Sequence, residues 1–409
     1  MKKLLALVLS AIMLLSFAAA SAETTLTYAN FSASGAQEET LKKMIEIFEQ
    51  KNPDINIDVQ LTGYTDYFTK LATQVGGGNA PDVFEMNMEN FLSYMLRGAC
   101  ADLTELGITR GNYSEGTLAA ASDGGKLYAV PMSFSTCVLF YNKALFDQAG
   151  VAYPTDDWTW ADAQAAAEKI AALGEDIWGY FQPITYNEFY KSIKGNGGSL
   201  LNADYTAFTV NTPENAEVLD AMIKRVRGEH HVMPNAEEMA GRGDWDLFTE
   251  GKLGMLVTGI WGFSTFTEKC KFDWDIVVEP GYKDKATFFF ANVNCVSPDS
   301  AKKEAAAKFI DAMGSDPDIV QLRLGANWEL PTIADQSKLS QYVEVTPPAN
   351  RAAVFTSMDF AAAPPALLEQ GAVSEIIGNV LSALETNEVT AQEALADIQT
   401  QLEEADLLK

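Results

Sequence analysis

Residues 126–150 read KLYAVPMSFSTCVLFYNKALFDQAG, and this stretch decides the fold. An apolar strand is predicted at Leu127–Val130, before Pro131, and a second strand at Val138–Tyr141. An amphipathic segment begins at Asn142. Two strand-like runs joined through a proline, in a chain too long for one core, predict a strand that leaves one domain and enters the next. We therefore interpret this stretch as a hinge crossing between domains.

The length of the chain predicts two domains. It has 409 residues, of which 47% are hydrophobic and 11% aromatic, so there is ample material for buried cores. Single hydrophobic cores stop growing at about 250–300 residues, so a chain of this length is expected to divide. No low-complexity linker separates the two predicted domains. We therefore expect the domains to move relative to each other by bending at a hinge.

The first 22 residues have the pattern of a secretory signal peptide. Lys2 and Lys3 form the basic region, residues 4–17 the apolar region, and Ala20-Ser21-Ala22 the small-residue cleavage site. The apolar region is shorter than the ~20 residues of a spanning helix, and no later segment reaches that length without charges. No cysteine follows the site for lipid attachment. The sequence predicts a periplasmic or secreted protein that is soluble after cleavage.

The charge of the chain argues against two classes of partner. The formal net charge is −27, and it becomes −29 without the leader, which contains two lysines and no acidic residue. A strongly acidic surface is repelled by nucleic acid and by anionic membranes. We expect neither as a partner, and we expect a monomer.

The four cysteines, Cys100, Cys137, Cys270 and Cys295, are widely spaced and form no C-x-x-C pair. In an exported protein they allow three pairings, which the sequence does not rank. Cys137 and Cys295 lie in apolar runs, where buried free thiols are at least as compatible with the pattern as a disulfide.

The N-terminal segments alternate between strand and helix patterns. Strands are predicted at 24–29, 55–61 and 82–86, and helices at 37–52 and 64–75. This β-α-β-α-β order is typical of a parallel sheet with helices on its faces. The later chain continues with helices at 159–173, 188–193, 213–227 and 301–313, strands at 253–258, 274–278 and 287–296, and a helical tail from 365.

Signatures of catalysis, cofactor binding and metal binding are missing from the sequence. His230 and His231 are its only histidines, and no zinc-protease, nucleophile-elbow, P-loop or dinucleotide motif occurs. Pairs of carboxylates such as Asp156-Asp157 and Glu237-Glu238 lie in polar surroundings typical of a solvated surface. We therefore expect a protein that is not an enzyme and carries no cofactor and no metal.

Aromatic residues at strand ends are the strongest indication of a binding site. Trp261 directly follows a predicted strand between Gly259 and Gly262, and Tyr141 ends the second strand of the opening stretch. Open α/β sheets bind ligands at the carboxyl ends of their strands. An aromatic ring there can stack on the apolar face of a sugar. For both residues, burial in a core is an equally good interpretation of the spacing.

Polar and aromatic residues follow the other predicted strands. Phe31 and Ser32 follow the first strand, and Asn87 and Glu89 follow the third. In a parallel sheet all four would lie at the same edge. Trp328 lies in a loop, where it could reach a cleft or cover a helix end.

Short segments in a fixed order give the chain a resemblance to a known family. It resembles the sugar-binding (family 1) extracellular solute-binding proteins of ABC transporters, which are similar to maltose-binding protein. The matching segments are IFE at 47, GNAPDV at 78, ADLT at 101, KLYAVP at 126, LFYNK at 139, WTW at 158, GGSLLN at 197, FTEGK at 248, WG at 261, AAAKFI at 305, LPT at 330 and EAL at 393.

The resemblance implies an α/β, two-lobed periplasmic-binding-protein-like fold of type II. Its lobes would be discontinuous, with 23–131 plus 287–330 as lobe 1 and 132–286 plus 331–409 as lobe 2. The chain would cross between them near Pro131, Thr287 and Pro331. By position, Tyr141 matches the tyrosine of the family's Tyr-Asn-Lys motif, Trp261 its stacking tryptophan, and Glu89 a polar residue that binds sugar hydroxyls.

Two positions depart from the family pattern. Met86 stands where some relatives carry a stacking tryptophan after the third strand, and the segment around Pro364 lacks an aromatic that others have. The size of the sugar is therefore open. The resemblance implies a receptor that binds a carbohydrate between its lobes and delivers it to a membrane permease. Alternatives are a receptor for a polyamine, a phosphate ester or a metal, and a secreted carbohydrate-active hydrolase.

Overall fold

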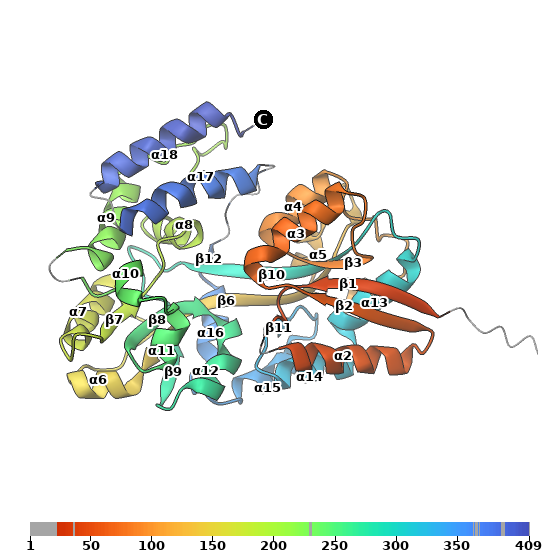
Figure 1. Cartoon of the computed structure of the whole chain (residues 1–409), viewed down its shortest axis with the longest axis horizontal. Coiled ribbons are helices and arrows are strands. Elements are labelled where there is room, and N and C mark those ends of the chain that lie inside the picture. The colour runs from red at the N-terminus through yellow and green to blue at the C-terminus, as the bar shows by residue number, and fades with distance from the viewer. Residues whose placement is uncertain are drawn as a thin grey trace, which may run out of the picture.

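A computed structural model describes residues 23–35, 37–228, 231–362, 364, 367, 369–385 and 389–408. The predicted signal peptide, residues 1–22, and His230 lie outside this part of the chain. The remaining residues form two lobes, joined by strands that run between them (Figure 1). This arrangement confirms the predicted α/β class.

One lobe, called lobe 1, contains the N-terminal β-α-β-α-β unit that the sequence predicted. Its first strand pairs in parallel with the second and the third. Its buried core comes from residues within 26–132 and 293–328. Its elements are β1 (Thr24–Asn30), α2 (Glu38–Lys51), β2 (Ile55–Leu61), α3 (Tyr64–Gly76), β3 (Val83–Asn87), α4 (Met88–Leu96), η1 (Arg110–Asn112), α5 (Glu115–Ala120), β4 (Ser122–Asp123), β5 (Lys126–Leu127), α13 (Lys303–Ser315) and α14 (Pro317–Gly325).

The other lobe, lobe 2, is built from the middle and the end of the chain. Two hydrophobic clusters fill it, one on each face of its strands. Its elements are α6 (Lys143–Ala149), α7 (Trp160–Ala171), β7 (Trp178–Phe181), α8 (Tyr186–Gly195), α9 (Pro213–Val226), α10 (Ala236–Met239), α11 (Asp244–Thr249), β8 (Leu253–Gly259), η2 (Ile260–Gly262), α12 (Phe263–Lys269), β9 (Trp274–Val277), η3 (Gln336–Leu339), α15 (Ser340–Val343), α16 (Ala352–Met358), β12 (Ala361–Ala362), α17 (Gln370–Ser382), η4 (Ala383–Glu385) and α18 (Ala391–Ala405).

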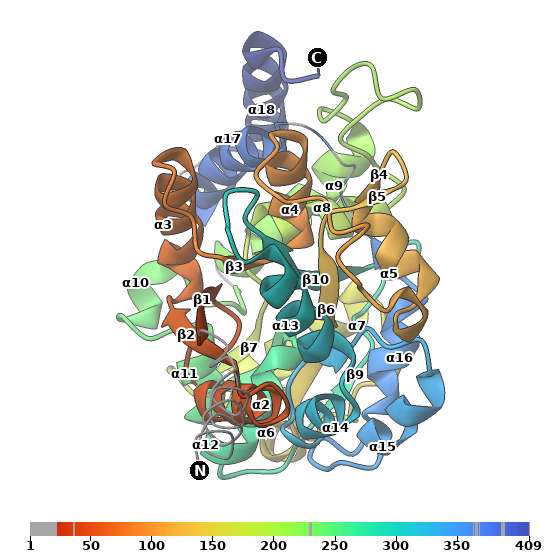
Figure 2. The ribbon, with the colours of Figure 1, turned by 90° about the vertical axis from the view of Figure 1, so that its right-hand side faces the viewer.

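Strands β6 (Val130–Asn142), β10 (Thr287–Val296) and β11 (Leu330–Pro331) make the connection. The sheet order is β2-β1-β3-β10-β6-β8-β7. β10 pairs with β3 of lobe 1 through residues 292–296, and β6 pairs with β8 of lobe 2 through residues 137–141. In the view turned by 90°, α13 lies in front of β6 and β10 (Figure 2). We propose the division 23–131 plus 287–330 and 132–286 plus 331–409 on this basis, with α14 also packing on the core of lobe 2.

The opening stretch differs from the two strands that the sequence predicted. Lys126–Leu127 pairs with β4 in a hairpin, and Val130–Asn142 forms one continuous strand that includes Pro131. The pairing of β6 with β10 shifts its register between Asn292 and Val293, and Pro131 lies opposite Val293. Proline has no N–H for the ladder and is tolerated at such irregularities. The proline therefore interrupts the pairing and not the strand.

Capping boxes begin two of the helices. Thr159 and Asp162 form a capping box at the start of α7, and Thr390 and Glu393 form another at the start of α18. In the described part of the chain, no helix combines the length and the hydropathy needed to cross a bilayer.

Candidate functional site

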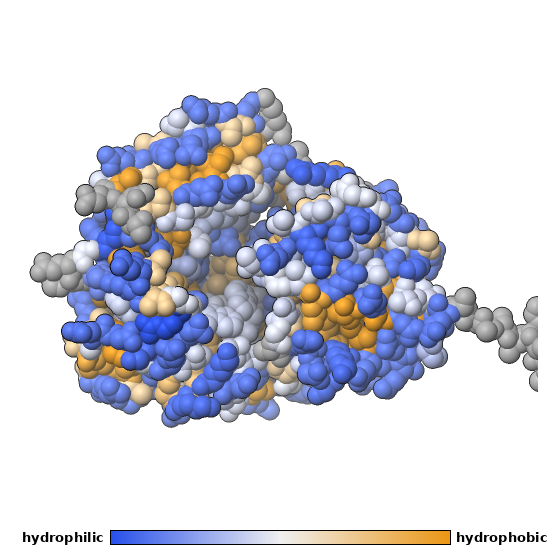
Figure 3. Space-filling view, viewed as in Figure 1, coloured by the Kyte–Doolittle hydropathy of each residue, from blue (hydrophilic) through white to orange (hydrophobic). Residues whose placement is uncertain are grey.

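A hollow separates the two lobes in the space-filling view, over the region where β6 and β10 cross in Figure 1 (Figure 3). β1 and β3 of lobe 1 are parallel, and β3 ends beside Asn292 of β10. β8 of lobe 2 ends beside Cys137 of β6, so these strand ends face the crossing strands. Ligand sites in open α/β sheets lie at such strand ends. We therefore describe the predicted site residues in relation to this hollow.

The turn after β1 is held by a buried carboxylate. Glu85 on β3 accepts hydrogen bonds from the backbone N–H groups of Phe31 (3.1 Å) and Ser32 (3.0 Å) and from the Ser32 hydroxyl (2.6 Å). Burial raises the pKa of Glu85 to about 7, against the lowering effect of the bonds from Ser32. Sequence reasoning missed Glu85 because a strand's alternation does not reveal which polar residue points into the protein.

Phe31 belongs to an aromatic cluster on lobe 1. Its ring lies 5.6 Å from the ring of Tyr64, between centroids, and 5.1 Å from that of Tyr67. Tyr64 is 58% exposed and begins α3, just after β2. The rule that placed Phe31 at a strand end, applied to β2, would also have found Tyr64.

Asn87 and Glu89 lie where β3 passes into α4. Asn87 caps the helix by accepting a hydrogen bond from the backbone N–H of Asn90 (3.3 Å), and its amide donates to the Tyr64 hydroxyl (3.4 Å). Glu89 follows in the first turn of α4, where an acidic residue faces the positive end of the helix dipole. These residues and the turn at Phe31 and Ser32 therefore lie at one edge of lobe 1, as the sequence predicted.

One oxygen of the Glu89 carboxylate has no hydrogen-bond donor among the residues that the structure describes. Its Oε2 atom is buried and accepts no hydrogen bond from the described residues. Burial raises its pKa to about 7. Burial, and then the charge of Glu89, raises the pKa of Tyr64 to about 12, although the Tyr64 side chain is largely exposed. A buried acceptor without a donor is able to accept a hydrogen bond from a ligand hydroxyl.

Trp261 lies on lobe 2 in η2, directly after β8. Its ring packs edge-to-face on Phe290 of β10, with the centroids 5.2 Å apart. Trp261 is partly exposed, whereas its neighbours Ile260 and Gly262 are buried. β10 pairs through Asn292 with Asn87 and continues toward Phe290 beyond the end of β3. The Trp261–Phe290 pair therefore lies beside the start of α4, where Glu89 is located.

Tyr186 is the buried first residue of α8 on lobe 2. Its hydroxyl accepts a hydrogen bond from the Gln370 amide (2.9 Å). Burial raises its pKa, and the charge of Glu89 adds a smaller rise. Neither Tyr186 nor Phe290 could be singled out from the sequence, because each lies in an apolar run that is typical of a core.

The structure places Tyr141 and Trp328 away from this group. Tyr141 is 5% exposed, and its ring lies 5.6 Å from the rings of Phe146 and Tyr153 in the cluster beneath α6 and α7. Trp328 is 2% exposed in the core of lobe 1, with the guanidinium of Arg323 at 4.3 Å from its ring. Both side chains point into cores, so neither is retained in the candidate site.

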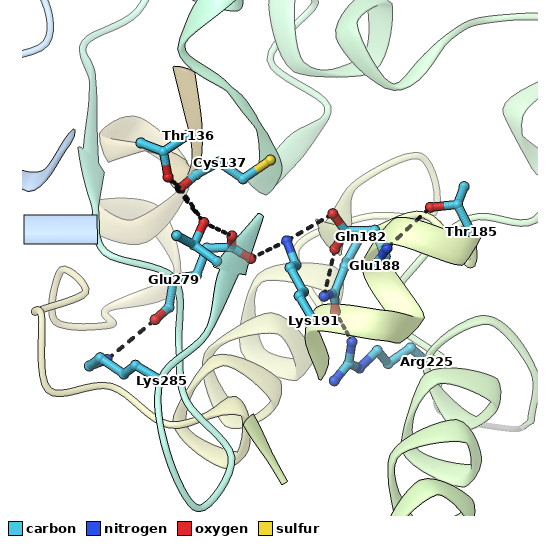
Figure 4. A network of polar contacts seen from close by, with 10 residues as sticks. Thr136, Cys137, Gln182, Thr185, Glu188, Lys191, Arg225, Glu279 and Lys285 are labelled. Carbon is cyan, nitrogen blue, oxygen red and sulfur yellow. Dashed lines mark hydrogen bonds and ion pairs between the residues drawn. The ribbon is translucent and has the colours of Figure 1, made fainter. Parts of the chain in front are cut away.

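A buried polar network connects the crossing strands to α8 and α9 (Figure 4). Lys191 forms ion pairs with Glu188 (2.8 Å) and Glu279 (2.6 Å), and Thr287 at the start of β10 donates to Glu279 (2.7 Å). Gln182 donates to Glu188 (2.8 Å) and accepts from Arg225. The network fixes the lobe 2 end of the crossing by pairing the buried charges with one another.

Within the described residues, no group of three or more histidine, cysteine or carboxylate side chains is arranged to hold a metal ion. The polar groups at the hollow are instead a carboxylate, an amide and hydroxyls beside aromatic rings. Such a set is suited to a neutral, hydroxyl-rich ligand.

The chain is similar to known proteins in sequence and in fold. The family model for the bacterial extracellular solute-binding proteins matches residues 32–319. A solved structure, the ABC substrate-binding protein Lmo0181 from Listeria monocytogenes in complex with cycloalternan, is 41% identical with a TM-score of 0.89. That alignment covers 94% of this chain and 99% of the Listeria chain.

Curated relatives match over a shorter region. A binding protein of Brucella abortus (strain 2308) is 27% identical over 256 residues, 60% of this chain and 60% of that protein. The arabinooligosaccharide-binding protein of Bacillus subtilis (strain 168) is 27% identical over 263 residues, 61% of this chain and 58% of that protein. The chain therefore spans about three fifths of the length of these relatives.

Proposed function

Because the chain belongs to the family of bacterial extracellular solute-binding proteins, we propose that it is the substrate-binding receptor of an ABC importer and that its ligand is a carbohydrate. The predicted membership is confirmed, since the family model covers well over half of the chain. The observation that carries the proposal of a carbohydrate is the partly exposed Trp261, held against Phe290 at the hollow. The Listeria protein, which was solved with cycloalternan, supports the same ligand class.

The two lobes supply different parts of the proposed binding chemistry. Trp261 offers a flat ring for the C–H face of a sugar, and Tyr64 and Phe31 offer a second aromatic surface on lobe 1. Glu89 accepts a hydrogen bond from a sugar hydroxyl through the oxygen that has no donor within the described residues. Ser32 and Asn87 complete the polar edge. A sugar bound by both lobes would contact each of them through a different interaction.

Closure of the lobes is the proposed signal to the permease. A ligand shifts an equilibrium between open and closed forms only if it binds one form more tightly. A sugar could contact Glu89 on lobe 1 and Trp261 on lobe 2 at the same time only when the lobes approach each other. It would therefore bind the closed form more tightly. The crossing strands β6, β10 and β11 would bend as the hinge.

Export and the lack of catalysis complete the proposal. We infer that the protein acts outside the cytoplasm, after cleavage of the leader that the first 22 residues indicate. We further infer that it releases its ligand unchanged. Glu85 supports this inference, because its carboxylate is engaged in hydrogen bonds with the turn at Phe31 and Ser32.

A thermal-shift screen against a sugar panel tests the proposal. The panel contains cycloalternan, maltose, maltotriose and arabinooligosaccharides, with spermidine and glycerol phosphate as non-sugar ligands. We expect a rise in Tm with at least one sugar, and the recovered sugar should be chemically unchanged. A response to the amine or phosphate ester alone would overturn the carbohydrate proposal, and conversion of the sugar would overturn the receptor role.

Trp261→Ala makes the test specific for the site. Calorimetric titration with the best sugar should show an affinity at least about tenfold lower, which corresponds to the loss of ~1.4 kcal/mol. Tyr205→Ala is the matched control, because Tyr205 is 63% exposed on a loop far along the chain from the strand ends. An unchanged affinity in Trp261→Ala, with normal folding, would show that the indole does not contact the sugar.

A further inference from the structure

Two cysteines from distant parts of the chain meet in the core of lobe 1. Cys100 lies shortly after α4 and is 4% exposed, and Cys295 lies on β10 and is fully buried. The residues that follow them are joined directly, because the backbone N–H of Ala101 donates to the carbonyl oxygen of Val296 (2.8 Å). The backbones of the two segments are therefore adjacent directly beside the cysteines.

Both thiols belong to the same buried core, that of lobe 1. Burial raises the pKa of Cys295 well above its usual value, and a side-chain contact with the Cys100 thiol raises it further. The other two cysteines belong elsewhere, since Cys137 lies in the core of lobe 2 and Cys270 packs against that core. Cys100 and Cys295 are therefore the two cysteines that share the core of lobe 1.

We propose that Cys100 and Cys295 form an intramolecular disulfide when the protein folds outside the cytoplasm. Both thiols are free in this structure. Extracellular compartments are oxidising, and disulfides that form there persist. The proposal is independent of the ligand, because neither cysteine reaches the hollow.

The reaction is a thiol–disulfide exchange with an external disulfide donor, such as oxidised glutathione or an exported oxidoreductase. One thiolate attacks the donor disulfide, forms a mixed disulfide and releases the first donor thiol. The second thiolate then attacks the protein sulfur of the mixed disulfide and releases the second. The protein loses two protons and two electrons, and the donor gains both. Because both thiols are buried, the exchange takes place during folding or local opening.

The cross-link would tie the ligand site to the hinge. Cys100 follows the helix that carries Glu89, and Cys295 belongs to the strand that carries Phe290. The loop closed by the bond contains most of lobe 2, so it removes considerable freedom from the unfolded chain. We expect the bond to raise Tm by roughly 2–8 °C.

Refolding of the purified protein tests the proposal. The unfolded, fully reduced protein is refolded in a mixture of oxidised and reduced glutathione and then alkylated under denaturing conditions. The intact mass of the protein, measured by mass spectrometry, gives the number of alkylated thiols. We expect two alkylated thiols after oxidative refolding, and four after refolding with reduced glutathione alone. A non-reducing peptide map should join the Cys100 peptide to the Cys295 peptide.

Two kinds of variant complete the experiment. Cys100→Ser and Cys295→Ser should each abolish the joined peptide and the rise in Tm, whereas the control Cys270→Ser should retain both. Four alkylated thiols in the oxidatively refolded wild-type protein, or a joined peptide that contains Cys137 or Cys270, would overturn the proposal. The wild-type mass and map decide the question even if a variant fails to fold. Sugar binding is measured separately, so its absence leaves this test intact.

Discussion

The indole of Trp261 lies directly over the α-carbon of Gly259, so closely that a β-carbon at residue 259 would overlap the ring. The backbone of Gly259 is extended, with φ −83° and ψ 164°, so any residue could adopt it. Glycine is therefore needed here for space and not for backbone freedom. The ring of Phe290 also packs on the indole, in an edge-to-face contact. Gly259 and Phe290 together fix the orientation of Trp261.

Gly259→Ala should weaken sugar binding while leaving every proposed ligand contact chemically intact. The added methyl group would push the indole off the backbone and change the angle of the ring. We expect an affinity loss of about tenfold, or ~1.4 kcal/mol, comparable with that of Trp261→Ala. Calorimetric titration checks the affinity, and Trp fluorescence reports the change in the indole environment.

Gly378→Ala is the matched control for this variant. Gly378 lies within α17, and a β-carbon there would meet nothing within 4 Å. Alanine is favoured over glycine inside helices, so the control should be as stable as the wild type or slightly more so. Unchanged affinity in Gly259→Ala would mean that the indole orientation is irrelevant to binding.

The strands of lobe 1 and their ends could be predicted from the sequence, but the direction of individual side chains could not. Phe31, Ser32, Asn87 and Glu89 were predicted to share an edge, and the parallel pairing of β1 and β3 places them there. Tyr141 has the same position relative to its strand, yet it packs against Phe146. Alternation along a strand fixes two faces, and which face meets the cleft depends on the packing of both lobes.

The same limit explains the residues that were missed. Glu85 could not be identified from the sequence, because its role is to accept hydrogen bonds from the turn after β1. The pairing of β1 with β3 brings Glu85 to that turn, and this pairing is a property of the fold. The continuous strand β6 was divided at Pro131 because the register shift opposite Val293 cannot be inferred from one strand alone. Contacts between distant segments decide such features.

Glu85→Ala should loosen the turn that carries Phe31 and Ser32. The substitution leaves two backbone N–H groups without their acceptor, which costs about 1–3 kcal/mol for a buried donor. We expect a lower free energy of unfolding and weaker sugar binding. Hydrogen exchange should be faster at the amides of Phe31 and Ser32, and this is the direct measurement.

Glu49→Ala separates stability from binding in this comparison. Glu49 accepts a hydrogen bond from the backbone N–H of Ile57 (2.8 Å), a bond of the same kind on the outer side of lobe 1. It should reduce stability with no loss of sugar affinity. Equal affinity losses in the two variants would indicate a general effect of instability and contradict the role given to Glu85.

Glu89 should make the protein less stable as the pH rises. Its pKa is raised by burial from 4.5 to about 7, so the folded state favours the protonated form. The resulting contribution to stability is fully present below pH 4.5 and is lost as the pH rises through 7. Glu89→Gln removes this dependence. From pH 5 to pH 8 the wild type should lose about 1–3 kcal/mol relative to the variant, because a tenfold change in a protonation equilibrium corresponds to ~1.4 kcal/mol.

Denaturant unfolding at the two pH values measures this difference. Glu46→Gln on the exposed side of α2 is the control and should leave the pH profile of the wild type unchanged. Parallel profiles for the wild type and Glu89→Gln would show that the Glu89 carboxylate is solvated in the unliganded protein, and the proposed hydrogen bond to a sugar would then lose its basis.

Lys191→Met should destabilise lobe 2 more than any surface charge change. The Lys191 side chain is 1% exposed and is the cation shared by Glu188 and Glu279. Its removal leaves two buried carboxylates without their partner, a change that typically costs ~3–5 kcal/mol. The double variant Lys191→Met with Glu279→Gln should recover part of this loss, because one of the unpaired charges is also removed. The control Lys224→Met breaks an exposed pair with Asp220 and should cost at most ~1 kcal/mol.

Lys191→Met should also weaken sugar binding, because Glu279 accepts a hydrogen bond from Thr287 at the start of β10. The affinity is measured by titration at a temperature where the variant is fully folded. A single variant as stable as the Lys224→Met control would show that water replaces the ammonium group and that the network does not hold the crossing.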